Sequence, residues 1–151
     1  MTDPFFAVLR ERRPDIDIVI LPPDRAAPVD PATPADLARS AEVVDATVAA
    51  ITARLPDPQV DGPTWEAFGP GLVRRRAALS TRTAEGGTIL RTLERAFAEA
   101  RWSSRLQIKA FHRWTAGRGD VDVVATWSER HDGLTVTVTG HELRTDGPEE
   151  S

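Results

Sequence analysis

The chain has 151 residues, of which 40% are hydrophobic and 28% charged, and its formal net charge at pH 7 is −4. This size and composition are typical of one folded domain with a sizeable core, and they argue against global disorder. No apolar run approaches the roughly 20 residues of a membrane-spanning helix, so no membrane partner is expected. The absence of cysteine excludes disulfides, thiolate metal ligands and cysteine nucleophiles.

Charge is distributed in three blocks along the chain. The formal charge is −6 over residues 1–70, +8 over residues 71–118 and −6 over residues 119–151. Such blocks indicate either attraction between parts of the same molecule or a basic surface that binds an anionic partner. Composition does not choose between these two interpretations.

The N-terminal sequence and the preference for arginine over lysine indicate the kind of organism and the cellular location of the protein. Only a few apolar residues precede Arg10, Glu11, Arg12 and Arg13, which is the wrong order for a secretory signal peptide. Arginine outnumbers lysine eighteen to one, a bias that we attribute to a GC-rich bacterial genome. We therefore expect a protein of the bacterial cytoplasm.

The first part of the chain predicts a short helix, a strand and a proline-rich connection. Pro4 is well placed in the first turn of a short N-terminal helix that ends before Pro14. Residues 15–21 alternate between polar and apolar side chains, which predicts a strand. Residues 22–34 contain five prolines and are expected to form a surface connection within a single domain.

A long helix is predicted between Thr33 and Leu55. Thr33, Pro34 and Asp36 form a good helix start. Apolar residues recur at spacings of three and four on one face: Leu37, Ala41, Val44, Val48, Ile51 and Leu55. This stripe is expected to pack on the protein's own sheet, and the alternative is a seam between two copies in a homodimer. Residues 56–71 are interpreted as a Pro- and Gly-rich loop.

The second half of the chain predicts a strand at 72–82, a helix at 84–101 and three further strands. Three alternating sets define the strands and their inner face: Leu106, Ile108, Ala110, His112 and Trp114; Val121, Val123, Ala125 and Trp127; Leu134, Val136 and Val138. Glycine-containing connections at 115–120 and 128–133 predict antiparallel hairpins. Residues 143–151 are expected to form a flexible acidic tail.

The predicted fold is a single α+β domain over residues 1–142. An antiparallel sheet of four or five strands is expected to pack against the two longer helices, with a short N-terminal helix beside them.

The candidate ligand-binding residues lie on the face of the sheet opposite the predicted core. They are Arg74, Arg76, Arg105, Lys109, Phe111 and Arg113. Basic side chains beside an aromatic ring are the minimum needed to bind phosphates and stack a base. The structural alternative is that a helix or the acidic N-terminal part covers this face, and the pI near 5.4 favours that alternative.

Catalytic and metal-binding motifs find little support. The spacing of His112, His131 and His141 matches no zinc motif, and His112 is interpreted as a hydrogen-bonded structural residue on the inner face. Gln107 and Lys109 resemble the glutamine-x-lysine element of certain metal-dependent nucleases, but no acid upstream completes it. The sequence also lacks a phosphate loop, a dinucleotide-binding fingerprint and a nucleophile elbow. We therefore expect no cofactor, no metal ion and no catalytic residue.

The sequence favours a non-catalytic binding or accessory protein that recognises another protein or an anionic ligand. The alternative is a nucleic-acid-binding domain that uses the basic sheet face. A small metal-dependent hydrolase built on Gln107, Lys109 and an unidentified acid ranks last.

Overall fold

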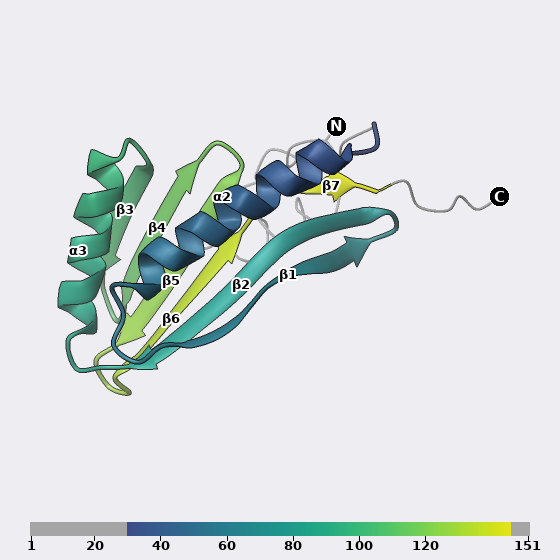
Figure 1. Ribbon diagram of the computed structural model, residues 1–151. Coiled ribbons are helices and arrows are strands. Elements are labelled where there is room, and N and C mark those ends of the chain that lie inside the picture. The colour runs from purple at the N-terminus through teal and green to yellow at the C-terminus, as the bar shows by residue number, and fades with distance from the viewer. Residues whose placement is uncertain (1–29, 146–151) are drawn as a thin grey trace, which may run out of the picture.

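The structure is a computed structural model that describes residues 30–145. Within this range the chain forms α2 (Pro34–Thr52), β1 (Gln59–Gly69), β2 (Leu72–Arg82), α3 (Gly86–Glu99), β3 (Ser103–Ile108), β4 (His112–Arg118), β5 (Val121–Ser128), β6 (Gly133–Thr139) and β7 (Leu143–Arg144). These seven strands make one antiparallel sheet in the order β1-β2-β6-β5-β4-β3, and β7 pairs with the start of β2. Both helices lie on the same side of the twisted sheet (Figure 1).

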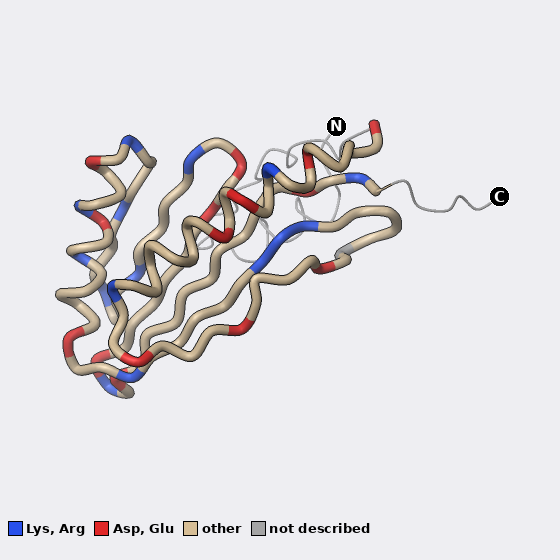
Figure 2. Tube along the Cα trace, viewed as in Figure 1, with Lys and Arg blue, Asp and Glu red and all other residues tan. Residues whose placement is uncertain are grey.

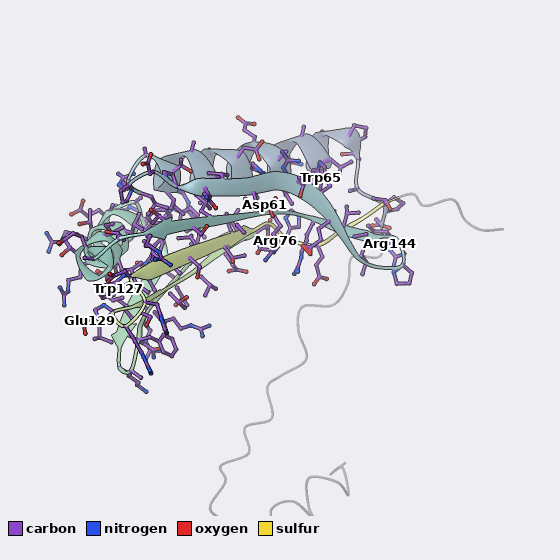
Figure 3. All side chains as sticks on the ribbon, turned by 90° about the horizontal axis from the view of Figure 1, so that it is seen from below. Asp61, Trp65, Arg76, Trp127, Glu129 and Arg144 are labelled. Carbon is purple, nitrogen blue, oxygen red and sulfur yellow. The ribbon has the colours of Figure 1, made fainter. Side chains whose placement is uncertain are left out.

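The two faces of the sheet differ because apolar and polar residues alternate along its central strands. On β5, Val121, Val123, Ala125 and Trp127 are buried, whereas Asp122 and Val124 are exposed. Neighbouring strands place their buried residues in the same rows, so the apolar side chains form one continuous inner face. Both helices cover this inner face. No described segment lies over the opposite, outer face (Figure 3).

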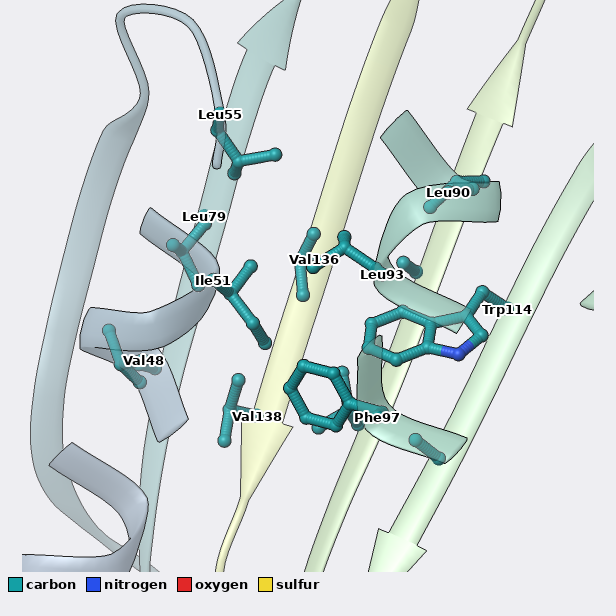
Figure 4. Close-up of a cluster of buried hydrophobic side chains, with 14 of the residues drawn as sticks. Val48, Ile51, Leu55, Leu79, Leu90, Leu93, Phe97, Trp114, Val136 and Val138 are labelled. Atoms are coloured by element: carbon teal, nitrogen blue, oxygen red, sulfur yellow. The ribbon is translucent and has the colours of Figure 1, made fainter. Parts of the chain in front are cut away.

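The core has two halves that meet over β6 (Figure 4). Val48 and Ile51 of α2 fill one half, and Leu93 and Phe97 of α3 fill the other. Trp114 is fully buried, and its ring lies 4.9 Å from that of Phe97 in an edge-to-face contact. The Trp114 indole donates a 2.9 Å hydrogen bond to the Ser104 hydroxyl, so the one polar atom of this side chain is satisfied.

The predicted start and packing of α2 are confirmed. The Thr33 hydroxyl accepts a hydrogen bond from the Asp36 amide, and the Asp36 carboxylate accepts one from the Thr33 amide, which is a complete capping box. Val44, Val48, Ile51 and Leu55 are buried against the protein's own sheet. The apolar stripe therefore needs no second copy of the chain.

The expectation of a four- or five-stranded sheet under two longer helices is wrong, because the sheet dominates the fold and has seven strands in the described part of the chain. The α+β class and the antiparallel hairpins are confirmed. One error is the segment interpreted as a loop at 56–71, which contains β1. Pro63 fits in β1 because this strand lies at the sheet edge and its register shifts between Asp61 and Thr64.

The second error concerns the single strand predicted through Leu106 and Trp114. Residues 109–111 form a turn instead, closed by a hydrogen bond from the Lys109 amide to the Phe111 carbonyl at 3.1 Å. Ile108 pairs with His112 across this turn. A three-residue turn keeps the alternation of inner and outer side chains in phase, so the sequence pattern contains no break that would reveal it.

Some predictions fall on the chain outside the described residues. These are the N-terminal helix, the strand at 15–21 and most of the connection at 22–34. Of the segment predicted as a flexible tail, Leu143 and Arg144 form β7, and Leu143 is buried. Residues 146–151 lie outside the described range.

We predict that Gly86→Ala destabilises the protein. A Cβ at this position would lie 2.1 Å from Cδ1 of Trp127, a buried ring that Thr83 also holds by accepting its indole hydrogen bond. Overpacking of this kind costs about 1–3 kcal/mol, although alanine is otherwise the better helix former by about 1 kcal/mol. Urea unfolding measures the change. Gly69→Ala, whose nearest neighbour would lie at 3.7 Å, is the matched control, and equal stability of the two variants would contradict the packing of α3 on Trp127.

A pH-dependent prediction follows from the capping box. Hydrogen bonds from the Thr33 amide and side chain hold the pKa of Asp36 below its ordinary value of 3.8. When folding lowers the pKa of a carboxyl group, the ionised group stabilises the folded protein at pH values above the unfolded-state pKa. This stabilisation is lost as the pH falls through the folded-state pKa. Asp36→Ala should therefore lower the urea midpoint at neutral pH, and the difference from the unsubstituted protein should shrink in acid below 3.8. A difference that is independent of pH would contradict this role for the carboxylate.

Candidate anion-binding face

Part of the predicted basic face lies on the outer side of the β3–β4 hairpin. Arg105 of β3 is opposite Thr115 of β4, and Gln107 is opposite Arg113. These side chains point away from the helices because the residues that alternate with them, such as Trp114, are buried on the inner face. Arg105 and Arg113 are both exposed. We call the outer side of β3, β4 and their connecting turn the hairpin face.

The turn of the hairpin carries the predicted residues Lys109 and Phe111. Phe111 is 46% exposed, and the neighbouring Ile108 is 49% exposed. Lys109 is also exposed. The hairpin therefore has basic residues along its length and two exposed apolar side chains at one end.

The remaining predicted residues, Arg74 and Arg76, lie elsewhere on the sheet. They belong to β2, and both β6 and β5 separate β2 from the hairpin (Figure 2). Both arginines share the carboxylate of Glu66 on β1, with Nε to Oε2 distances of 3.4 Å for Arg74 and 3.8 Å for Arg76. The six predicted residues thus form two separate groups, and the group on β2 lies beside an acid.

An open depression of about 810 Å³ lies at the other end of the hairpin face. Gly117 lies between Ser103 of β3 and Asp122 of β5 in one row of the sheet, and the Asp122 carboxylate lies beside it, with Oδ1 3.0 Å from where a Cβ of residue 117 would stand. We call this depression the arginine hollow. Its side chains come from the end of α3 and from β3, β4 and β5, and they include Arg101, Ser103, Arg105, Thr115, Arg118, Asp122 and Val124.

Arg101 occupies an unusual backbone position at the end of α3. Its φ is +69°, and it follows the C-cap residue Ala100. The Trp102 amide donates to the Phe97 carbonyl at 2.9 Å and the Arg101 amide donates to the Ala98 carbonyl at 3.0 Å, which together make a Schellman motif. Glycine is the usual residue at this left-handed position, where other L-residues are strained by about 1–2 kcal/mol. An arginine at this position makes its side chain a candidate for a role beyond ending the helix.

The positive charges of the hollow have few partners. Within residues 30–145, no carboxylate lies within ion-pair distance of Arg101, Arg105 or Arg118. Arg118 makes a long hydrogen bond of 3.5 Å to the Ala100 carbonyl, at the negative end of the α3 dipole. Guanidinium groups in a depression bind phosphate and carboxylate groups well, because their planar donors match the oxygens of these anions.

The hollow also contains groups that recognise neutral parts of a ligand. Ser103 and Thr115 offer hydroxyl groups, and the exposed carboxylate of Asp122 accepts hydrogen bonds. A carboxylate repels a bare anion. The donor set therefore fits a ligand that carries both an anionic group and a hydroxyl or amino group.

The histidines and acids give no further site in the described part of the chain. His112 lies on the inner face, with its ring 4.9 Å from that of Trp127, but its Nδ1 atom has no hydrogen-bond partner among these residues. His141 lies 3.8 Å from a carboxylate oxygen of Asp120. No group of three histidine, aspartate or glutamate side chains within residues 30–145 could hold a metal ion.

Sequence reasoning missed Arg101, Arg118 and Gly117 as members of one site. The sequence predicts only a hairpin connection at 115–120, which contains Gly117 and Arg118, and only the end of a helix at Arg101. Their proximity depends on the pairing of Ser103 with Gly117, which the undetected turn at 109–111 determines. The one local signal was an arginine, in place of glycine, at the end of a predicted helix.

Comparisons with known proteins give no family. No protein-family model matches the chain, and no curated protein is similar to it in sequence. Among solved structures, the fold is distantly similar to that of LppA, a proposed lipoprotein from Mycobacterium tuberculosis, with 13% sequence identity and a TM-score of 0.36 over 74% of this chain and 78% of that chain. A similarity this low assigns neither family nor function. In the described residues no helix is long and apolar enough to cross a bilayer, and the cytoplasmic location stays a prediction.

We predict that Arg101→Gly makes the protein more stable while weakening its binding of anions. Removing a left-handed non-glycine residue relieves about 1–2 kcal/mol, of which the flexibility of glycine in the unfolded chain offsets about 0.5–1 kcal/mol. Urea unfolding measures the gain, and a pyrophosphate titration followed by NMR at the Ser103 and Gly117 amides measures the binding. A stability gain without loss of binding would mean that the Arg101 side chain does not serve the hollow.

Proposed function

We propose that this chain is a non-catalytic binding or accessory protein that recognises a phosphate-bearing ligand through its hairpin face. The observation that carries the proposal is the arginine hollow, which Arg101, Arg105 and Arg118 line without an ion pair in the described part of the chain, and in which the Asp122 carboxylate lies beside Gly117. The left-handed backbone of Arg101 is consistent with it, because strained residues cluster at functional sites.

The class of ligand follows from the donors and acceptors in the hollow. Three guanidinium groups favour a phosphate over a single carboxylate, because a phosphate carries more charge and more acceptor oxygens. The hydroxyls of Ser103 and Thr115 and the carboxylate of Asp122 add contacts for ligand hydroxyl groups. A sugar phosphate unit, either free or within a polymer, has this combination.

A single-stranded nucleic acid is the second candidate, and the length of the hairpin face favours it. Basic residues continue from the arginine hollow through Arg113 to Lys109, over a strand of six residues that is about 20 Å long. The exposed ring of Phe111 at the far end could stack on a base. Chains that bind single strands combine a positively charged path with such aromatic platforms.

The test is a titration with a fluorescently labelled oligouridylate of about 12 nucleotides, a length within the range covered by small single-strand-binding domains. Anisotropy is measured across a range of salt concentrations for the unsubstituted protein and for Arg105→Ala. The proposal predicts that log K falls linearly with log salt, and that removing Arg105 reduces this slope by about 0.7. Arg91→Ala, at an exposed position of α3 outside the hairpin face, is the matched control and should leave the slope unchanged.

The outcomes separate the two candidates. Binding of oligouridylate that Arg105→Ala and Phe111→Ala both weaken supports the nucleic acid. Binding of pyrophosphate or a sugar phosphate at the Gly117 amide, without binding of the oligonucleotide, supports a small phosphorylated ligand. If Gly117→Val, which fills the hollow, binds every probe as well as the unsubstituted protein does, the proposal is wrong.

A further inference from the structure

The two helices leave an apolar groove between them on the inner side of the sheet. α2 packs on β1, β2 and β6, whereas α3 packs on β3, β4 and β5. The groove between them has a volume of about 690 Å³. Its walls are built mainly from small or apolar side chains, namely Val43, Ala46 and Ala50 of α2 and Ala96, Phe97 and Ala100 of α3. Trp102 and Val121 also line it.

The dimensions of the sheet explain why the groove exists. Six strands spaced about 4.8 Å apart span roughly 29 Å, whereas two helices of about 10 Å diameter cover roughly 20 Å. The inner face is therefore wider than two helices packed side by side. Val43, at the edge of the groove, is 43% exposed.

Arg54 and Arg118, which have no carboxylate partner among residues 30–145, give the groove a positive charge at its ends. Arg54 donates to the Ala50 carbonyl at 2.8 Å near the C-terminal end of α2, and Arg118 contacts the Ala100 carbonyl at the C-terminal end of α3. The helices run in roughly opposite directions (Figure 1), so these two arginines lie toward opposite ends of the groove. In the described part of the chain neither guanidinium forms an ion pair.

The remaining polar groups that line the groove come from α2 and from the segments that follow β4 and β6; they are Arg39, which pairs with Asp36, Ser40, Glu42, Thr47, Asp120 and His141. Glu42 lines it on one side, and Asp120 is engaged by His141 on the other. The hydroxyl of Ser40, a lining residue that is 6% exposed, has no hydrogen-bond partner among the described residues. A buried hydroxyl without a partner is costly, and a bound chain could supply one.

We propose that this groove binds an amphipathic helix of a protein partner, with an apolar face that is flanked by carboxylate side chains. The apolar face would pack against Ala46, Ala50 and Ala100, whose small side chains allow a close approach. The carboxylates would pair with Arg54 and Arg118. This is the helix-in-groove mode of recognition. The groove lies on the helix side of the sheet and shares Arg118 with the arginine hollow, but its apolar walls and Arg54 belong to the groove alone, so the proposal stands or falls independently of the proposed function.

The probe is a phage-displayed library of helical peptides with fixed apolar residues at positions i, i+3, i+4 and i+7 and random residues elsewhere. Selection is made on the full-length chain. The proposal predicts that the selected peptides carry Asp or Glu beside the apolar stripe, and that Ala50→Arg weakens their binding by about ten-fold or more, which corresponds to about 1.4 kcal/mol. Ala98→Arg, at an exposed α3 position that does not line the groove, is the matched control and should leave binding unchanged.

Val43→Lys repeats the test at a second exposed position, and thermal melts confirm that each variant is folded. Arg54→Glu should weaken the acidic peptides and favour basic ones. The proposal is overturned if no peptide is enriched, if Ala50→Arg and Ala98→Arg bind the peptides equally, or if decanoate displaces them at low concentration, which would indicate a small amphiphile. It is also overturned if light scattering shows a dimer that Ala50→Arg dissociates, because the occupant would then be a second copy of the chain.

Discussion

The structure depends on one constraint, which is that only one face of the sheet is apolar. The apolar side chains of this face must be removed from water: α3 covers those of β3, β4 and β5, such as Trp114 and Trp127, and α2 covers those of β1, β2 and β6, such as Leu79. Phe97 carries this packing across the sheet by contacting both Trp102 and Trp114 at ring distances of 4.8 and 4.9 Å. The outer face is left polar, and no described helix or loop covers it.

This one-sided arrangement separates two surfaces with different chemistry. The outer face presents arginine and hydroxyl side chains, whereas the inner side has a groove with apolar walls between the helices. Arg118 borders both of them, because it lies at the end of β4 and next to the end of α3. The three blocks of charge in the sequence correspond to parts of the fold. The basic block, residues 71–118, supplies β2, α3, β3 and β4. Among the described residues it pairs with the acidic block before it through Arg75 with Asp45, and through Arg74 and Arg76 with Glu66.

The sequence predicts the elements whose signals are local. α2 begins where Thr33, Pro34 and Asp36 predict, and β2 has the predicted bounds of residues 72 and 82. Two features were not predicted because tertiary pairing overrides their local signals. Strand β1 contains a proline that only an edge position tolerates, and the turn at Lys109 to Phe111, which separates β3 from β4, has no glycine, proline or asparagine. The same distinction between local and tertiary signals explains why only part of the candidate site was predicted. Arg105 and Arg113 follow from alternation alone, whereas the grouping of Arg101, Gly117 and Arg118 depends on which strands are neighbours.

The most direct test of this account is the solvent accessibility of the outer face in the full-length chain, measured by phenylglyoxal modification of arginine with mass spectrometry. Arg75 is the internal reference, because its side chain is 17% exposed and pairs with Asp45 at 3.1 Å. The account predicts that Arg105 and Arg113 are modified quickly and Arg75 slowly. If Arg105 and Arg113 were protected as strongly as Arg75 in the absence of any ligand, the outer face would be covered by the protein itself, and the proposed binding face would be contradicted.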